Sequence, residues 1–195
     1  MKIDIGGQKG RNHFGGQRWE TVDIRKDADY QIDIMNDKLP FEDNSIEAVY
    51  TSHTLEHIFP DILPFVLSEF SRVLKKGCKV RIVVPDIDKA IKAYIKDDTK
   101  YLKDSRNPTK LPCLPDMAIC YLSSWFFSYK EDAKTHERLI GGHVNVFNFE
   151  LLKYYMEKAG FKNIERKSLN DCSDEFKNHD HDRYKDCSIY TEGVK

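Results

Sequence analysis

A group of reactive side chains follows a short apolar run in the first third of the chain. Residues 46–50 are rich in β-branched and aromatic residues, a composition typical of a strand. Thr51, Ser52 and His53 come directly after this run, and His57 follows in the next helical turn. Histidine titrates near neutral pH and therefore suits proton transfer. Ligands of an open α/β sheet bind just beyond the carboxyl ends of parallel strands, so these four side chains lie where chemistry is expected.

Two aspartates in other expected strands form a second set of candidates. Asp4 lies in an alternating run that stops at Gly6 and Gly7, and Asp23 lies near the end of the run at residues 19–24. The glycine-dense segment between the two runs allows the backbone to approach a ligand closely. Taken alone, each aspartate is better explained as a strand-end acid that caps nearby backbone. The dinucleotide pattern G-x-G-x-x-G is absent, which counts against an NAD-dependent sugar enzyme.

These residues need a sheet and helices to hold them in place. Apolar patterns and turn residues predict strands at residues 2–5, 19–24, 28–34, 46–50, 80–84, 163–169 and 188–194. Helices are predicted at residues 61–76, 88–96, 117–129 and 150–159. We expect Asp61 to cap the first helix and Gly77 to end it. Strands that alternate with helices indicate an α/β fold with a mostly parallel sheet, in one domain at residues 1–195.

The connections between these elements carry further expectations. Barely a dozen residues, many of them glycine, join the first two strands, which predicts a reduced first crossover with little room for a helix. Residues 97–115 are polar and contain several prolines, as an extended loop does. Residues 170–186 are very polar, so the run His179-Asp180-His181-Asp182 within them is predicted to be exposed loop rather than a metal cluster. No metal site is expected.

The composition limits the class of protein. The 195 residues suffice for a core without disulfides, and a formal net charge of −1 gives no field that would draw in nucleic acid or a membrane surface. The five cysteines are odd in number and form no Cys-x-x-Cys pair, which argues against a zinc ribbon or redox motif. No apolar run approaches the ~20 residues of a membrane span, and the N-terminus lacks a signal-peptide core. The expected location is cytoplasmic.

Several motifs, in their order along the chain, resemble the class I S-adenosylmethionine-dependent methyltransferases, and in particular a small branch linked to sugar and polysaccharide pathways. The block at residues 39–57, with Leu-Pro-Phe, Asp-Asn-Ser, Ser-His and Leu-Glu-His, is the most specific. Residues 2–7 resemble the first-strand motif, although Gln8-Lys9-Gly10 replaces its usual third glycine. Residues 72–77 resemble the end of the fourth helix, and residues 148–161 resemble the helix before the sixth strand. The resemblance implies a three-layer, Rossmann-like fold.

The resemblance also implies a site for S-adenosylmethionine. Asp23 matches the acid that accepts both ribose hydroxyls, and Asp4 matches the first-strand acid near the methionine ammonium. The other matching positions are the close backbone at Gly6 and Gly7, the second-strand end at Ile24, the adenine position at Asp33 and Ile34, and the methionine end at Thr51 and Ser52. Asp37 is a rival for Asp33, because the loop up to Leu39 differs in length from the usual pattern.

Methyl transfer is an in-line displacement at a sulfonium carbon, in which the protein mainly positions the reactants. A base is needed only where the acceptor loses a proton, as a sugar hydroxyl does. The candidates for this base are His53, His57 and His143. The expected acceptor is a small molecule with a sugar-type hydroxyl, and the insertion at residues 97–142 is expected to form the wall of its pocket.

The sequence leaves other readings open. The altered glycine loop, and Lys76 and Cys78 in place of the usual proline and glycine, are compatible with a domain that binds the cofactor weakly or not at all and serves as a partner protein. Nucleic-acid methylation is disfavoured, because no Asn/Asp-Pro-Pro-aromatic motif follows the fourth strand. The covering helix usual before the first strand is lacking, so the second subunit of a homodimer could close the pocket.

Overall fold

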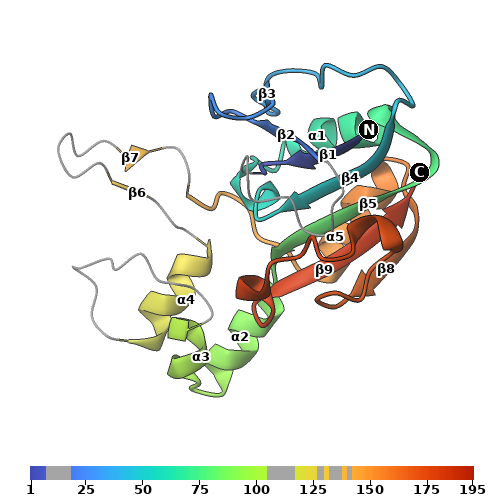
Figure 1. The fold of residues 1–195 in the computed structure, drawn as a ribbon. Coiled ribbons are helices and arrows are strands. Elements are labelled where there is room, and N and C mark those ends of the chain that lie inside the picture. Colours follow the sequence, from blue (N-terminus) through green and yellow to red (C-terminus); the bar gives the residue numbers. More distant parts are fainter. Residues whose placement is uncertain (8–18, 105–116, 127–129, 132–137, 140–141) are drawn as a thin grey trace.

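The computed structural model describes residues 1–7, 19–104, 117–126, 130–131, 138–139 and 142–195. Its main feature is a seven-stranded sheet with the order β3-β2-β1-β4-β5-β9-β8 (Figure 1). The strands are β1 (Lys2–Ile5), β2 (Glu20–Asp23), β3 (Tyr30–Gln31), β4 (Ile46–Ser52), β5 (Leu74–Pro85), β8 (Lys162–Lys167) and β9 (Ser188–Val194). Neighbouring strands are parallel except at β9, which is antiparallel to both β5 and β8. This sheet confirms the predicted α/β class.

The structure also contains helices on one face of the sheet and beyond the end of β5 (Figure 1). They are α1 (Leu63–Val73), α2 (Ile87–Ile95), α3 (Thr99–Asp104), α4 (Ala118–Phe126) and α5 (Phe149–Lys158), with the short 3-10 helices η2 (Leu55–His57), η3 (Asp174–Phe176) and η4 (Asp182–Tyr184). Two short strands, β6 (Lys130–Glu131) and β7 (Arg138–Leu139), form a separate ribbon. Within the described part of the chain, none of the helices combines the length and apolar character needed to cross a membrane.

The elements differ from the prediction at a few boundaries. The third strand is shorter than residues 28–34, because the chain turns at Asp33, whose carbonyl oxygen accepts from the N–H groups of Asn36 and Asp37. Helix α3 lies inside the stretch predicted to be an extended loop. The predicted reduced crossover falls on residues 8–18, outside the described residues.

The first long helix starts later and ends earlier than predicted. Ile62 rather than Asp61 is its N-cap residue, and a proline occupies its first turn. At the other end, the N–H groups of Asn44 and Ser45 donate to the carbonyl oxygens of Arg72 and Val73. These bonds satisfy two of the carbonyls that a helix end leaves open, so the chain can leave the helix there. The next residues already belong to β5, and the predicted stop at Gly77 is wrong.

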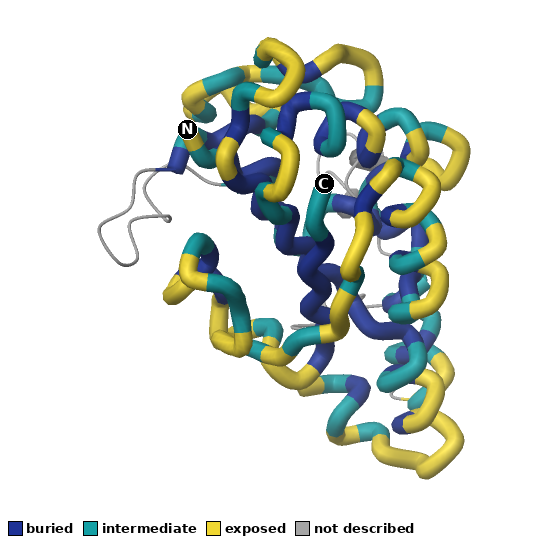
Figure 2. The backbone as a smooth tube through the Cα atoms, turned by 90° about the vertical axis from the view of Figure 1, so that its right-hand side faces the viewer, coloured by how far each residue is buried: buried dark blue, intermediate teal, exposed yellow. Residues whose placement is uncertain are grey.

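The two faces of the sheet are covered by different parts of the chain. Helices α1 and α5 pack on one face and contribute Leu67, Phe70, Leu152 and Met156 to the main core. Helices α2, α3 and α4 lie together beyond the end of β5 and enclose a second apolar cluster around Trp125 (Figure 1). The strands run through the buried centre of the molecule, and many of the outer turns are exposed (Figure 2).

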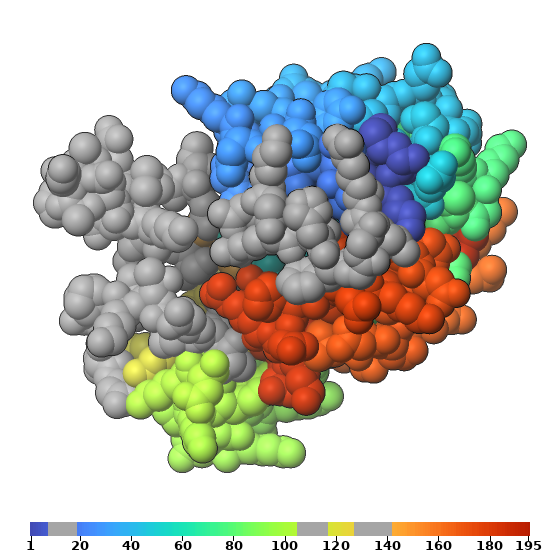
Figure 3. Space-filling view, viewed as in Figure 1, coloured from blue at the N-terminus to red at the C-terminus, as the bar shows by residue number. Residues whose placement is uncertain are grey.

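The connection between β8 and β9, predicted to be solvated, covers the opposite face. Phe176 is fully buried there with Trp19 and Tyr50, and His179 and Asp180 are also buried. Their predicted exposure is wrong, because buried groups of the sheet bind them. On the face seen in Figure 3, this part of the chain, in orange to red, lies against the first strand in dark blue.

Buried charges anchor this connection. Arg81 on β5 has a fully buried side chain and donates from Nε to Oδ1 of Asp180 and from Nη1 to Oε1 of Glu192, both at 2.9 Å. Its guanidinium also donates to the backbone carbonyl of Ser168 at 3.0 Å. A buried arginine requires such partners, since an unpaired charge in the interior is very costly.

Candidate active site

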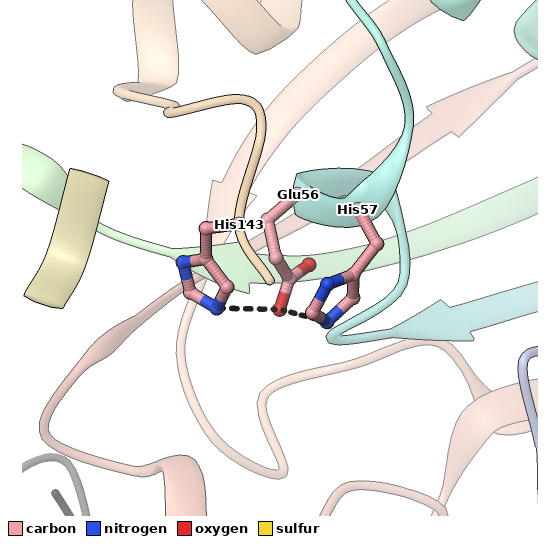
Figure 4. A group of neighbouring side chains, drawn as sticks. All are labelled: Glu56, His57 and His143. Carbon is pink, nitrogen blue, oxygen red and sulfur yellow. Dashed lines mark ion pairs between the residues drawn. The ribbon is translucent and has the colours of Figure 1, made fainter. Parts of the chain in front are cut away.

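Glu56 lies at the centre of the candidate site. It belongs to η2, directly after β4, and its side chain is 2% exposed. Nδ1 of His53 lies 3.2 Å from Oε1 of Glu56, and the Nε2 atoms of His57 and His143 each lie 3.9 Å from the same oxygen. The three histidines predicted as alternative bases therefore converge on one carboxylate, and Figure 4 shows two of them flanking it.

The loop that carries His143 is tied to η2 through the backbone. The N–H groups of Val144 and Asn145 donate to the carbonyl oxygen of Glu56 at 2.9 and 3.1 Å. The side-chain amide of Asn145 donates to the carbonyl of Ile58 at 3.5 Å. These bonds hold a distant part of the sequence at the carboxyl end of β4, where the fold positions ligands.

A second contact fixes the rings of His57 and His143. Nδ1 of His57 lies 3.1 Å from the carbonyl oxygen of Gly142, and Nδ1 of His143 lies 3.3 Å from that of Trp125. A carbonyl accepts only, so Nδ1 donates in both rings. Their Nε2 atoms then face Glu56.

His53 is held more tightly than the other two histidines. Its ring stacks on Tyr184 of η4, with ring centroids 3.6 Å apart, and its Nε2 lies 2.8 Å from Oγ of Ser188. Its backbone has φ of 52°, a left-handed conformation that costs energy in a residue with a Cβ. Such conformations persist where the surrounding structure enforces them, and they often mark functional sites.

The charge of Glu56 is set by opposing effects. Burial raises the pKa of this carboxyl, but the attraction of His53, His57 and His143 outweighs burial, so the pKa lies below its ordinary value. Among the described residues, no donor is aligned for a hydrogen bond with either carboxylate oxygen. The site thus holds a buried carboxylate surrounded by imidazoles.

The predicted cofactor positions lie at the neighbouring strand ends. Gly6 has φ of 76°, and a Cβ at this position would overlap the side chain of Thr54. At the end of β2, both oxygens of Asp23 accept from Arg25, one from its N–H at 2.9 Å and one from its guanidinium at 3.0 Å. The same guanidinium donates to the carbonyl oxygen of Gly7 at 2.8 Å and so joins the ends of β1 and β2.

Asp4 lies beneath this edge of the sheet. Its carboxylate is buried, with Oδ2 3.3 Å from Nε2 of His179, whose ring packs on Trp19 and Tyr50. A Cβ on Gly7 would run into the same carboxylate. Asp4 therefore supports the loop after β1 from below.

The remaining predicted residues differ in their surroundings. Thr51 is buried, and its hydroxyl donates to the carbonyl of Ile5 at 3.0 Å, whereas Oγ of Ser52 is buried with no partner among the described residues. Ile24 is 62% exposed just past β2. The carboxylate of Asp33 accepts from the N–H of Met35 and from the amide of Asn36, so it stabilises its own turn. Ile34 packs against the main core.

Sequence reasoning did not assign a role to several residues of this site. Glu56 lies between Leu55 and His57 in the predicted turn, but the sequence gave no sign that it faces His53, because His53 lies before the helix with a left-handed backbone. Arg25 follows Asp23 by two residues, a spacing that suits a local contact. Tyr184 and Ser188 come from the other end of the chain, and nothing in the sequence indicated that they contact His53.

Comparison with known proteins agrees with this architecture. A family model described as a methyltransferase domain matches residues 18–82, about a third of the chain, from the start of β2 into β5. No curated protein matches the sequence. Solved structures match almost the whole chain at low identity.

Three of these structures are informative. A SAM-dependent methyltransferase from Archaeoglobus fulgidus is 15% identical, with a TM-score of 0.55 over 100% of this chain and 85% of that one. A Haloferax volcanii methyltransferase in complex with the Trm112 activator is 15% identical, with a TM-score of 0.55 over 99% and 80%. The Burkholderia thailandensis 1,6-didemethyltoxoflavin-N1-methyltransferase, with bound S-adenosylhomocysteine, is 11% identical, with a TM-score of 0.53 over 100% and 70%.

At these identities the structural likeness shows the fold. Together with the matched segment, it confirms the predicted resemblance to class I methyltransferases. The matched segment is described as a methyltransferase domain, and the three structures above are methyltransferases.

Proposed function

We propose that this protein transfers a methyl group from S-adenosylmethionine to a small-molecule acceptor, and that the acceptor group is a hydroxyl of a sugar or polysaccharide precursor. The observation that carries the proposal is the convergence of His53, His57 and His143 on Glu56 at the carboxyl end of β4. This group adjoins the ends of β1 and β2, where the cofactor of such a fold is expected.

The residues at the strand ends fit the cofactor. Asp23 would accept the ribose hydroxyls with lone pairs that its bonds to Arg25 leave available, and the exposed side chain of Ile24 offers an apolar surface for the adenine. The buried hydroxyl of Ser52 would gain a partner at the methionine end. Gly6 and Gly7 supply backbone without side chains in the way, and Asp4 supports that backbone.

The other assigned residues support this site less directly. Thr51 would act by holding β4 to β1, since its hydroxyl is already bonded to Ile5. Asp33 and Ile34 would border the adenine as parts of the turn after β3. We do not assign a cofactor contact to Asp37.

When bound, the cofactor supplies an activated methyl group. The chain's own part is to hold the acceptor in line with that group and to take the proton that a hydroxyl acceptor loses. His53, His57 and His143 are the candidates to take that proton. Glu56 and His143 border a crevice with Ile87 and Trp125 that is too narrow to admit a water molecule. An acceptor would therefore approach the group from the side of His57, whose side chain is 35% exposed.

Calorimetric titration with S-adenosylmethionine tests the cofactor site. We expect Asp23→Asn to weaken binding about tenfold or more, because the amide replaces one of the two acceptor oxygens with a donor and removes the negative charge. Asp27→Asn, an exposed change in the same turn, should leave the affinity unchanged. Equal affinities for both variants and the wild type would remove Asp23 from the site.

Transfer of a labelled methyl group tests the acceptor. We expect incorporation into at least one member of a panel of nucleotide sugars, and we expect an Asn replacement of the active histidine to abolish turnover while cofactor affinity is retained. Incorporation only into amine acceptors would overturn the hydroxyl assignment. Tight cofactor binding without transfer to any acceptor would favour a binding domain instead.

A further inference from the structure

We propose that Glu56, His57 and His143 bind a divalent transition-metal ion. Each residue offers one ligand atom, and these atoms all lie within 4.8 Å of one another (Figure 4). Ligand atoms about 2.1 Å from a tetrahedral ion lie roughly 3.4 Å apart, so the observed 3.9 Å between each Nε2 and Oε1 requires only a small movement of the side chains.

The second contacts of the two rings already orient them as metal ligands. Nδ1 of His57 donates to the carbonyl of Gly142, and Nδ1 of His143 donates to the carbonyl of Trp125. A proton on Nδ1 leaves the lone pair of a neutral ring on Nε2, which is the atom that faces Glu56. Metal-bound histidines are commonly held by this kind of bond to a backbone carbonyl.

The ligand atoms of Glu56, His57 and His143 are all able to donate a lone pair, and they meet at one point. When both rings are neutral, their lone-pair nitrogens face Oε1 of Glu56. The nearest nitrogen to that oxygen is Nδ1 of His53 at 3.2 Å, and neither oxygen of Glu56 has an aligned donor among the described residues. A buried carboxylate without an aligned donor is unfavourable, because burial removes its hydration and little replaces it. A cation between the three atoms removes that cost, since each atom can donate its lone pair to it.

The ligand set and its exposure indicate the kind of ion. Two imidazoles and one carboxylate suit zinc, iron(II) or another first-row ion rather than magnesium or calcium, which prefer oxygen ligands. Glu56 and His143 are buried, whereas the side chain of His57 is 35% exposed. Three protein ligands with one open side are typical of catalytic rather than structural sites.

If the proposed methyl transfer to a hydroxyl holds, the ion has a direct use in it. With His57 and His143 as ligands, a hydroxyl oxygen bound to the divalent ion would lose its proton more readily, and His53 is the candidate base left to take it. The resulting alkoxide attacks the methyl carbon. The new C–O bond forms as the C–S bond of the sulfonium breaks, and S-adenosylhomocysteine leaves.

Metal binding can be measured without cofactor or acceptor. The full chain is stripped with a chelator and titrated with Zn²⁺ in a calorimeter, and then with Co²⁺ while its visible absorption is recorded. We expect one ion per chain, and a loss of affinity of about tenfold or more in His57→Ala and in His143→Ala. His181→Ala, which removes an exposed histidine outside the group, is the matched control and should bind as the wild type does.

If His143→Ala, at a buried position, does not fold, His57→Ala still tests the proposal, because the side chain of His57 is partly exposed. The absence of a stoichiometric ion in the wild type, or an unchanged affinity in His57→Ala, would overturn the proposal. Stoichiometric metal binding without methyl transfer would leave this proposal standing and count against the proposed function. Methyl transfer by a chain that binds no ion would support the proposed function and overturn the metal site.

Discussion

At the scale of single residues, Gly6 is constrained both by its backbone and by its neighbour. Its φ of 76° lies in the region that residues with a Cβ rarely adopt, and a Cβ would also overlap Thr54. Gly77 has only the backbone constraint, because its φ is 77° but nothing lies within 4 Å of an added Cβ.

We therefore predict different costs for the same substitution. Gly77→Ala should lower the free energy of unfolding by about 1–2 kcal/mol, the cost of a left-handed residue. Gly6→Ala should cost clearly more, because Thr54 and the ends of β1 and β4 must also move. Urea denaturation of both variants measures the difference, and equal losses would show that the loop after β1 yields without strain.

The same scale shows what could be predicted about the site. Asp23, His53 and His57 could be proposed as site residues because strand ends and helical turns are local patterns. The partnership of His53 with Ser188 was not predictable, since these residues are 135 positions apart and neither belongs to a shared motif. The contact of Glu56 with His53 was not predictable either, since it depends on the left-handed backbone of His53 before the short helix.

At the scale of elements, helix α1 holds the segment before β4 through Arg72 and Glu69, and Arg72 also pairs with Asp43 of that segment at 2.8 Å. Arg72 donates to Glu69 at 2.8 Å and to the carbonyl oxygens of Leu39 and Phe41, while Glu69 accepts from the N–H of Leu39 at 2.9 Å. The hydrogen bonds from Arg72 and Leu39 hold the pKa of Glu69 below its ordinary value of 4.5. The segment that leads into the site is thus fixed by a carboxylate that must stay ionised.

This gives a pH prediction. Since the pKa of Glu69 is lowered in the folded state, its contribution is present above pH 4.5 and is lost as the pH falls through the lower folded value. We expect Glu69→Gln to lose about 1–3 kcal/mol at pH 7 and to approach the wild type at lower pH. Urea denaturation at several pH values measures this difference.

The control for that series is Glu42→Gln, an exposed change in the segment that Glu69 holds. It should follow the wild type at every pH. A stability difference for Glu69→Gln that stays constant down to pH 3 would mean that the pair does not depend on the charge of Glu69.

Elements were predictable where their signals were local. The apolar spacing in α1 and the β-branched run of β5 identified both, but not the boundary between them. That boundary depends on the N–H groups of Asn44 and Ser45, which bind the last helical carbonyls from a distant part of the chain. Gly77 predicted the wrong C-terminal end for helix α1. Leu74 already pairs with Ile46 in the sheet, and this pairing outweighs the preference of Gly77 for a helix end.

At the scale of the whole molecule, Arg81 joins segments that are far apart in sequence. It links β5 to Asp180 in the β8–β9 connection, to Glu192 on β9 and to the backbone after β8. This buried group explains why a polar stretch lies against the sheet. Its polar composition predicted exposure, since composition does not reveal a buried partner on another strand.

We predict that Arg81→Met destabilises the protein by about 3–5 kcal/mol, because it leaves two buried carboxylates without their cation. Lys75→Met on the same strand breaks an exposed pair with Glu47 and should cause no resolvable change. Thermal unfolding compares the two variants. Similar effects at both positions would show that the carboxylates find other partners.

The place of β9 in the sheet has a consequence for shortened forms of this chain. β9 lies between β5 and β8, and β8 pairs with no other strand among the described residues. Removal of residues 188–194 would open hydrogen-bonding edges on β5 and β8 at once. Unpaired edges recruit strands from other molecules, so cleavage within the preceding turn would turn a well-folded protein into an aggregating one.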